Sequence, residues 1–201
     1  MASAAGYAGI NSTGADGYLA RGKAMYNQGN YAGAIDQLSH LKRMPVSSTV
    51  ADCADFYIAM SNYERGNRES LDALRAYLAQ HPSDVNAARV QAAIADYYFY
   101  NGKYGEAITE YDKVRTAALD GDASEDVYYR RAYSLLRLGE YEQALVNINA
   151  LRGSRRYAAA NTFYQAYVDY ANKRYGEALT KFQRVKGNGE LAYNAQYYVA
   201  Q

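Results

Sequence analysis

Small, aromatic and turn-forming residues recur along the chain at a nearly constant spacing. Four stretches share the pattern Gly/Lys-x-Tyr-x-x-Ala and begin at Gly29, Gly102, Gly139 and Lys173. A degenerate copy begins at Gly66, so the five starts are 37, 36, 37 and 34 residues apart. A step of this length fits two helices and their connections. The pattern therefore predicts a series of helix pairs.

A second series of small residues stands seven positions before each start, and it continues once more after a further 34 residues. Its members are Gly22, Ala59, Ala95, Ala132, Ala166 and Ala200. The helices that follow the turns carry a matching series: Ala34, Ala107, Ala144 and Ala178. Two helices that cross at close range need small side chains at the crossing point. We therefore expect these residues, called the crossing residues below, to mark where each pair packs together.

The turn between the two helices of a pair falls on the glycine that starts the pattern. Glycine tolerates the left-handed conformation that commonly ends a helix. Lys173 tolerates it less well, so we expect the fifth turn to be strained or differently shaped. Pro45 and Pro82 are 37 residues apart and fall between pairs, where a proline does not interrupt a helix.

Together these features predict the order of the elements. The helix pairs are expected at about 17–43, 51–80, 86–118, 124–152 and 157–186, after a flexible tail over 1–15. One domain over 16–201 is expected to hold repeats at about 16–49, 50–85, 86–122, 123–155, 156–190 and, in part, 191–201. The last segment fits either a capping helix or the beginning of a sixth pair in a longer protein.

The repeated stretches resemble the tetratricopeptide repeat (TPR) family, in which small residues lie at helix crossings, an aromatic follows the turn glycine and a proline ends the repeat. The resemblance covers about 16–201, and it departs from the pattern at Arg68, Leu71 and Lys173. It implies an all-α fold: a right-handed superhelix, or α-solenoid, of antiparallel helix pairs, with five repeats and the start of a sixth. It also implies a bacterial-type scaffold or adaptor without catalytic activity.

Composition and charge narrow the choice of partners and location. The 22 basic and 21 acidic residues are interleaved, which argues against a nucleic-acid partner. No stretch approaches the roughly 20 apolar residues of a membrane span, and the first residues lack a signal-peptide pattern. Because the tyrosine-rich, cysteine-poor and proline-poor composition resembles repeat proteins of bacterial envelopes, we favour the periplasm or cell envelope, after removal of a leader, over the cytoplasm.

No motif nominates catalytic, metal or cofactor chemistry. The lone Cys53 forms no internal disulfide and lacks partners for a metal site. The stretch 17–24 is close to a phosphate-binding loop, but Ala24 replaces the Ser/Thr that contacts magnesium. The acidic stretch 120–126 lacks the calcium-loop pattern, and we expect Asp122 or Ser124 to cap the next helix. His40 and His81 are expected at the surface.

The TPR resemblance implies that the first helices line a concave groove. The predicted groove residues are Leu19, Lys23, Tyr26, Phe56, Met60, Tyr63, Ala92, Asp96, Phe99, Tyr129, Tyr133, Leu136, Phe163, Tyr167, Tyr170 and Tyr197. Most of them are Phe or Tyr. Phe56, Phe99 and Phe163 could equally pack between neighbouring helices as core.

An aromatic groove with few charges suits a protein or peptide with apolar anchors. Because Lys23 is the only cation in the predicted set, we expect no clamp for an acidic C-terminus. Two alternatives stay open. The groove could bind carbohydrate in the envelope, or the array could be a structural module whose groove is filled by its own C-terminal region or by a second copy, with a homodimer through the exposed C-terminal helix.

Overall fold

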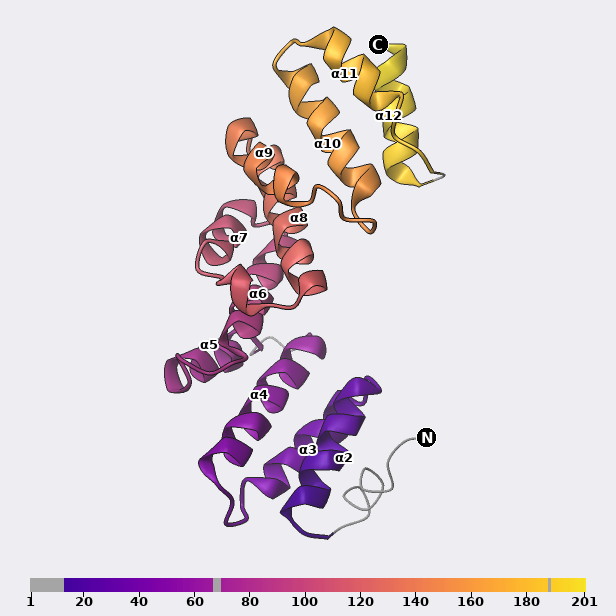
Figure 1. The fold of residues 1–201 in the computed structure, drawn as a ribbon. Coiled ribbons are helices and arrows are strands. Elements are labelled where there is room, and N and C mark those ends of the chain that lie inside the picture. Colours follow the sequence, from indigo (N-terminus) through magenta and orange to yellow (C-terminus); the bar gives the residue numbers. More distant parts are fainter. Residues whose placement is uncertain (1–12, 67–69, 188) are drawn as a thin grey trace. The chain divides into compact units, whose positions relative to one another are not determined.

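The computed structural model describes residues 13–66, 70–187 and 189–201, and every element in these ranges is a helix (Figure 1). The elements are α2 (Ala15–Asn27), α3 (Tyr31–Leu41), α4 (Ser48–Glu64), α5 (Ser70–Gln80), α6 (Ala87–Tyr100), α7 (Tyr104–Tyr111), the 3-10 helix η1 (Thr116–Ala118), α8 (Gly121–Arg137), α9 (Tyr141–Ala150), α10 (Ala158–Ala171), α11 (Tyr175–Phe182) and α12 (Glu190–Ala200). The all-α prediction is confirmed. The predicted tail lies outside the described residues up to residue 12, as does Arg68 in the degenerate turn.

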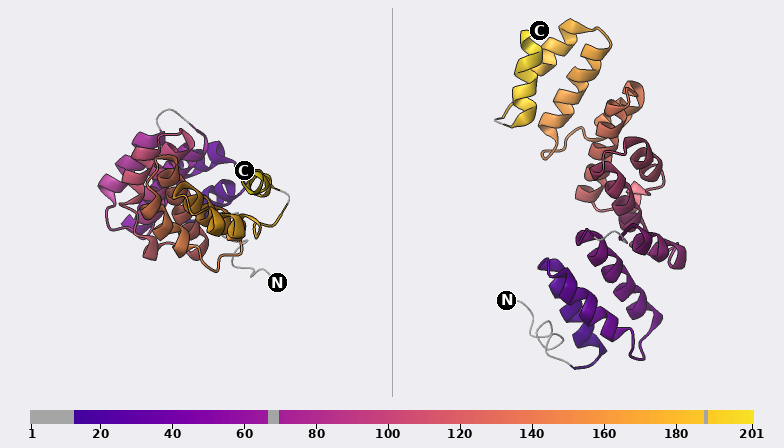
Figure 2. Two further views of the ribbon diagram at one scale, coloured as in Figure 1. Left: turned by 90° about the horizontal axis from the view of Figure 1, so that it is seen from above. Right: turned by 180° about the vertical axis from the view of Figure 1, so that it is seen from behind.

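The chain divides into two compact units, Met1–Tyr97 and Tyr98–Gln201, with the boundary inside α6. In unit 1, α2 packs against α3 and α4 packs against α5. In unit 2, α8 pairs with α9 and α10 with α11, while α12 packs against both α10 and α11. The alternating course of these neighbouring helices can be followed in Figures 1 and 2. The single domain over 16–201 stays a prediction.

The crossing residues of the five pairs are buried, as the pattern expects, whereas Ala200 at the end of α12 is exposed. Ala95, Ala132 and Ala166 are fully buried in the first helices, and Ala107 and Ala144 are fully buried in the second helices. At Gly22 even a methyl group is too large, because a Cβ there would lie 2.5 Å from Cγ of Leu38. The helices therefore approach as closely as these small residues permit.

All five turns share one backbone conformation. The φ angles are 75° at Gly29, 67° at Gly66, 69° at Gly102, 79° at Gly139 and 62° at Lys173. The fifth turn is therefore shaped like the others, and of the two expectations for it, strain at Lys173 is the one that fits. A lysine in the left-handed region brings its Cβ too close to the following carbonyl oxygen.

Changing Lys173 to glycine should raise the free energy of unfolding by about 0.5–1 kcal/mol, because glycine relieves this strain but loses more entropy on folding. Urea unfolding followed by circular dichroism measures the effect. Gly139→Ala is the matched control and should lower the free energy of unfolding. Its effect comes from the backbone alone, because a Cβ at Gly139 meets no atom within 4 Å. Equal stability of both variants and the parent would contradict the assignment of strain.

The start and the end of some elements differ in detail from the sequence predictions. The side chain that caps α8 belongs to Asp120, which accepts a hydrogen bond from the backbone N–H of Ala123 at 2.8 Å. The prediction of Asp122 or Ser124 as the cap is wrong, because the helix begins earlier, at Gly121. Of the two histidines expected at the surface, His40 is exposed, whereas His81 is mostly covered. Its side chain is only 13% exposed, and its ring nitrogens lie 3.4 Å from Asp52 and 3.6 Å from Asp55.

One buried carboxylate links α10 to α11. Asp169 accepts hydrogen bonds from Nη2 of Arg174 at 2.7 Å and from Nε at 2.9 Å, and its other oxygen pairs with Lys181. Burial by itself would raise the pKa of this carboxyl group, but the hydrogen bonds from Lys181 and Arg174 outweigh it and lower the pKa. The ionised carboxylate therefore stabilises the fold.

Asp169→Asn should lower the free energy of unfolding by about 1–2 kcal/mol at neutral pH, because charge-assisted hydrogen bonds are lost. Since the folded pKa lies below the unfolded one, the difference between parent and variant should be complete above roughly pH 4 and shrink as the pH falls further. Urea midpoints of both proteins at several pH values test this. A difference that stays constant down to strong acid would show that the charge contributes nothing.

Candidate functional site

A hollow of about 360 Å³ lies over three first helices of unit 2. We call it the groove, and nine residues line it: Tyr133, Leu136 and Arg137 from α8, Phe163, Tyr164 and Tyr167 from α10, and Asn194, Tyr197 and Tyr198 from α12. Its volume is within the range of pockets that bind ligands. Six of the nine residues are Phe or Tyr, and Arg137 is the single charged one.

The crossing residues explain why these side chains face the groove. Ala132 and Ala166 turn toward the partner helix and are fully buried. The next residues, Tyr133 and Tyr167, lie about 100° further around the helix and so leave that interface. The same register operates in both helices, which aligns their tyrosines along one side of the unit.

The floor of the groove is built from buried rings. The ring of Phe163 is 7% exposed and lies in edge contact with Phe182, with centroids 5.4 Å apart. Tyr164 is also buried, and its hydroxyl donates a hydrogen bond to the hydroxyl of Tyr129 at 3.2 Å. Burial raises the pKa of Tyr164, so the hydroxyl stays neutral. The floor is therefore apolar, with its one buried hydroxyl satisfied.

The rim formed by α12 is open. Tyr197 occupies the position in α12 that Phe163 occupies in α10, three residues before the crossing residue, yet it is 61% exposed. Its ring contacts Tyr198 edge to face at 5.5 Å. An exposed ring beside a buried apolar floor can close over an incoming side chain.

Arg137 ends α8 and is held by tyrosines. Its Nη1 donates hydrogen bonds to the hydroxyls of Tyr133 at 3.1 Å and Tyr104 at 3.3 Å. Its Cζ lies 5.0 Å from the ring centroid of Tyr104 and 5.8 Å from that of Tyr133, within cation–π range. The hydrogen bond to Tyr133 raises the pKa of the guanidinium group. The groove therefore presents a fixed positive charge.

The structure brings together five of the predicted groove residues: Tyr133, Leu136, Phe163, Tyr167 and Tyr197. Phe56 and Met60 are buried in unit 1, and Phe163 is both core and groove floor. The half-buried predicted residues outside the groove are Leu19, Lys23, Tyr26, Tyr63, Ala92, Asp96, Phe99 and Tyr129. Within unit 1, Lys23 lies over the ring of Tyr57, which also contacts Tyr26.

Four groove residues are absent from the sequence-based set: Arg137, Tyr164, Asn194 and Tyr198. Each stands at a fixed offset from a crossing residue. Arg137 follows Ala132 by five positions, and Asn194 precedes Ala200 by six. Tyr164 and Tyr198 each precede their crossing residue by two positions. A wider range of positions around each crossing residue would have included them.

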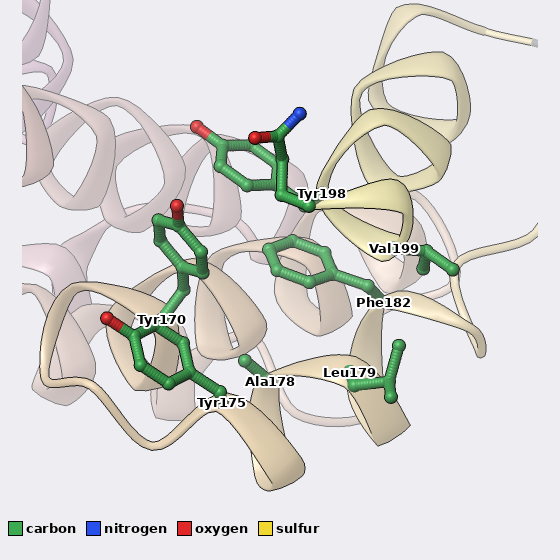
Figure 3. A pocket seen from close by; sticks show the side chains of 8 residues that line it. Tyr170, Tyr175, Ala178, Leu179, Phe182, Tyr198 and Val199 are labelled. Carbon is green, nitrogen blue, oxygen red and sulfur yellow. The ribbon is translucent and has the colours of Figure 1, made fainter.

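A second hollow of about 350 Å³, shown in Figure 3, lies among α10, α11 and α12. Its lining is uncharged: Tyr170, Tyr175, Ala178, Leu179, Phe182, Tyr198, Val199 and Gln201. The rings of Phe182 and Tyr198 stack with centroids 4.9 Å apart and planes 6° from parallel. Tyr198 lines both hollows, and Phe182 contacts Phe163 of the groove floor. Tyr170, predicted for the groove, lies in this hollow instead.

Neither a metal site nor a membrane-spanning helix is found in the part of the chain that the structure describes. No group of three or more His, Cys, Asp and Glu side chains is placed there to hold a metal ion. None of the helices described has both the length and the apolar character of a membrane span.

Comparisons with known proteins bear on the fold. The sequence matches no protein-family model and no curated protein. Among solved structures, MamA from AMB-1 superposes with a TM-score of 0.64 at 20% identity, covering 88% of this chain and 98% of that one. MamA from MSR-1 gives a TM-score of 0.61 at 19% identity, covering 90% and 95%. A Podospora anserina structure described as kinesin light chain TPR-like repeats gives 0.54 at 14%, covering 91% and 93%. The chain therefore has the TPR-type fold, an α-solenoid of helix pairs.

Proposed function

We propose that the chain is a non-catalytic interaction module and that the groove of unit 2 binds a segment of another protein. The observation that carries this proposal is the composition of the groove: six aromatic residues, a buried apolar floor and one charge. TPR-type folds serve many processes, so the proposal rests on the site and not on the fold.

The groove offers the features that concentrate binding energy at protein interfaces. Apolar anchors gain most when they enter a preformed, well-packed pocket. Tyrosines provide large contact areas and lose little conformational entropy, while their hydroxyls donate or accept hydrogen bonds. The partner we expect is an extended or helical peptide segment whose apolar side chain reaches Phe163 and Leu136.

Tyr197→Ala should weaken such binding about tenfold, because it removes the exposed ring over the pocket. The probes are peptides enriched from a randomised phage library on the parent protein and then synthesised, with affinities measured by fluorescence polarisation. Tyr193→Ala is the matched control, since Tyr193 is a similarly exposed tyrosine of α12 outside the groove lining. Equal losses for the two variants, or no loss for Tyr197→Ala, would place binding elsewhere.

The alternatives from the sequence remain distinct candidates. Exposed tyrosine rings such as that of Tyr197 also stack on sugars, which would suit the periplasmic or envelope location expected from composition. Quenching of tyrosine fluorescence by soluble glycans, when no peptide is enriched, would favour carbohydrate. The third alternative is a groove filled by the chain's own C-terminal region or by a second copy, as in a homodimer through the exposed C-terminal helix, α12. In such a homodimer the uncharged second hollow beside α12 would add the exposed Leu179 of α11 to the interface. Light scattering of the parent and of a Leu179→Glu variant would detect such a dimer.

A further inference from the structure

Arg137 is the only charge in an otherwise neutral groove, and its position bears on what the groove selects. We propose that Arg137 recognises an acidic side chain, Asp or Glu, that lies within the bound segment next to its apolar anchor. This inference rests on the function proposed above, because it assigns a specificity to the same groove.

Three other arginines of unit 2 are balanced by carboxylates of the chain, whereas the hydrogen-bond partners of Arg137 are uncharged. Arg131 pairs with Asp112, Arg156 with Asp126, and Arg174 with Asp169. The partners of Arg137 are the hydroxyls of Tyr104 and Tyr133, which carry no charge. Within the described residues no carboxylate lies in ion-pair distance of Arg137. A ligand can therefore supply to Arg137 the anion that the chain itself supplies to these three arginines.

The tyrosines position the guanidinium group and leave most of its donors available. Both hydrogen bonds to hydroxyls use Nη1, whereas a guanidinium group has five N–H donors in a rigid fork. Nε and Nη2 form the pair that a carboxylate can accept in parallel. Because the two rings already orient the side chain, less conformational entropy is lost when the carboxylate binds.

The surroundings favour one carboxylate side chain over more highly charged groups. Recognition of phosphate generally uses a cluster of arginines, and the groove lining contains one cation. Arg137 lies one residue from Leu136, which lines the same hollow as Phe163. An acidic residue adjacent to an apolar residue would therefore contact the charge and the floor together. This arrangement needs no free C-terminus.

The test uses a library of randomised peptides fused internally to a phage coat protein, panned on the full chain. We expect Asp or Glu to be enriched beside an apolar residue on the parent, and this enrichment to disappear on Arg137→Gln while the apolar preference persists. Arg137→Lys should retain a weaker acidic preference. Arg155→Gln, at an exposed arginine outside the groove lining, should behave as the parent does.

Synthetic, acetylated and amidated copies of the enriched peptides then measure the coupling. Replacing the acidic residue by its amide should weaken binding to the parent about tenfold and leave binding to Arg137→Gln unchanged, as in a double-mutant cycle. Circular dichroism checks that each variant is folded, which we expect because Arg137 is exposed.

The outcomes separate the inference from the proposed function. Peptides enriched without an acidic residue, or with an acidic preference that survives in Arg137→Gln, would overturn the inference and leave the groove proposal standing. A preference for a free C-terminal carboxylate or for a phosphorylated residue in the synthetic set would also overturn it. Failure of any peptide to be enriched on the parent would count against the proposed function itself.

Discussion

Replacing Phe182 by alanine should cost about 3–5 kcal/mol of unfolding free energy, the largest effect we expect from a single substitution. The ring is 2% exposed and is held by Phe163 and Tyr198, so it joins α11 to both α10 and α12. Alanine would leave a cavity where three helices meet. Because small domains are stable by only about 5–15 kcal/mol, the loss would remove a large fraction of the stability.

Urea unfolding followed by far-ultraviolet circular dichroism measures this effect, and the same experiment on Val146→Ala is the control. Val146 is 68% exposed on α9, so its truncation should change the midpoint little. Phe182→Leu should fall between the two, since it refills part of the cavity. A loss below about 1 kcal/mol for Phe182→Ala would mean that the ring contributes no more than a surface residue does.

Gly22→Ala should destabilise the chain by about 2–3 kcal/mol, although alanine forms helices better than glycine does. The new Cβ would lie 2.5 Å from Cγ and 2.6 Å from Cδ2 of the fully buried Leu38. The helices α2 and α3 would have to separate, or Leu38 would have to leave its rotamer. Steric overlap therefore outweighs the gain in helix propensity.

The same substitution in a first helical turn provides the control with the opposite sign. A Cβ added at Gly105 in α7 or at Gly176 in α11 would meet no atom within 4 Å, and both glycines are exposed. Gly105→Ala and Gly176→Ala should therefore be neutral or stabilising by up to about 1 kcal/mol. If Gly22→Ala also stabilised the chain, close helix packing would not be the reason for the small residue.

The repeat could be predicted from sequence because its determinants are local. A close helix crossing requires a small residue at a fixed spacing, as at Gly22 and Ala166. Both the residue type and the spacing can be read directly from the sequence. The left-handed turns follow in the same way from Gly102 and Gly139. Lys173 shows the limit of such reasoning: its neighbours impose the common turn although its own preference opposes it.

The site could be predicted only in part, because several of its properties depend on contacts between repeats. Phe163 is buried through Phe182, a residue of the following helix, whereas Tyr197 at the equivalent position of α12 stays exposed. Arg137 lies one position beyond the last residue predicted on α8. Its side chain is held in place by a hydrogen bond to Tyr104, 33 residues earlier, which no local pattern connects to it.

The common geometry of the turns also affects how the gene can change in length. Gly102 and Gly139 are 37 residues apart, and each is followed by one residue and then a tyrosine. Deleting residues 103–139 would join Gly102 to Glu140 and Tyr141, which reproduces an intact turn and second helix. Recombination between two such copies thus yields a continuous repeat without a new junction. One whole repeat can therefore be gained or lost while the helices on either side keep their register.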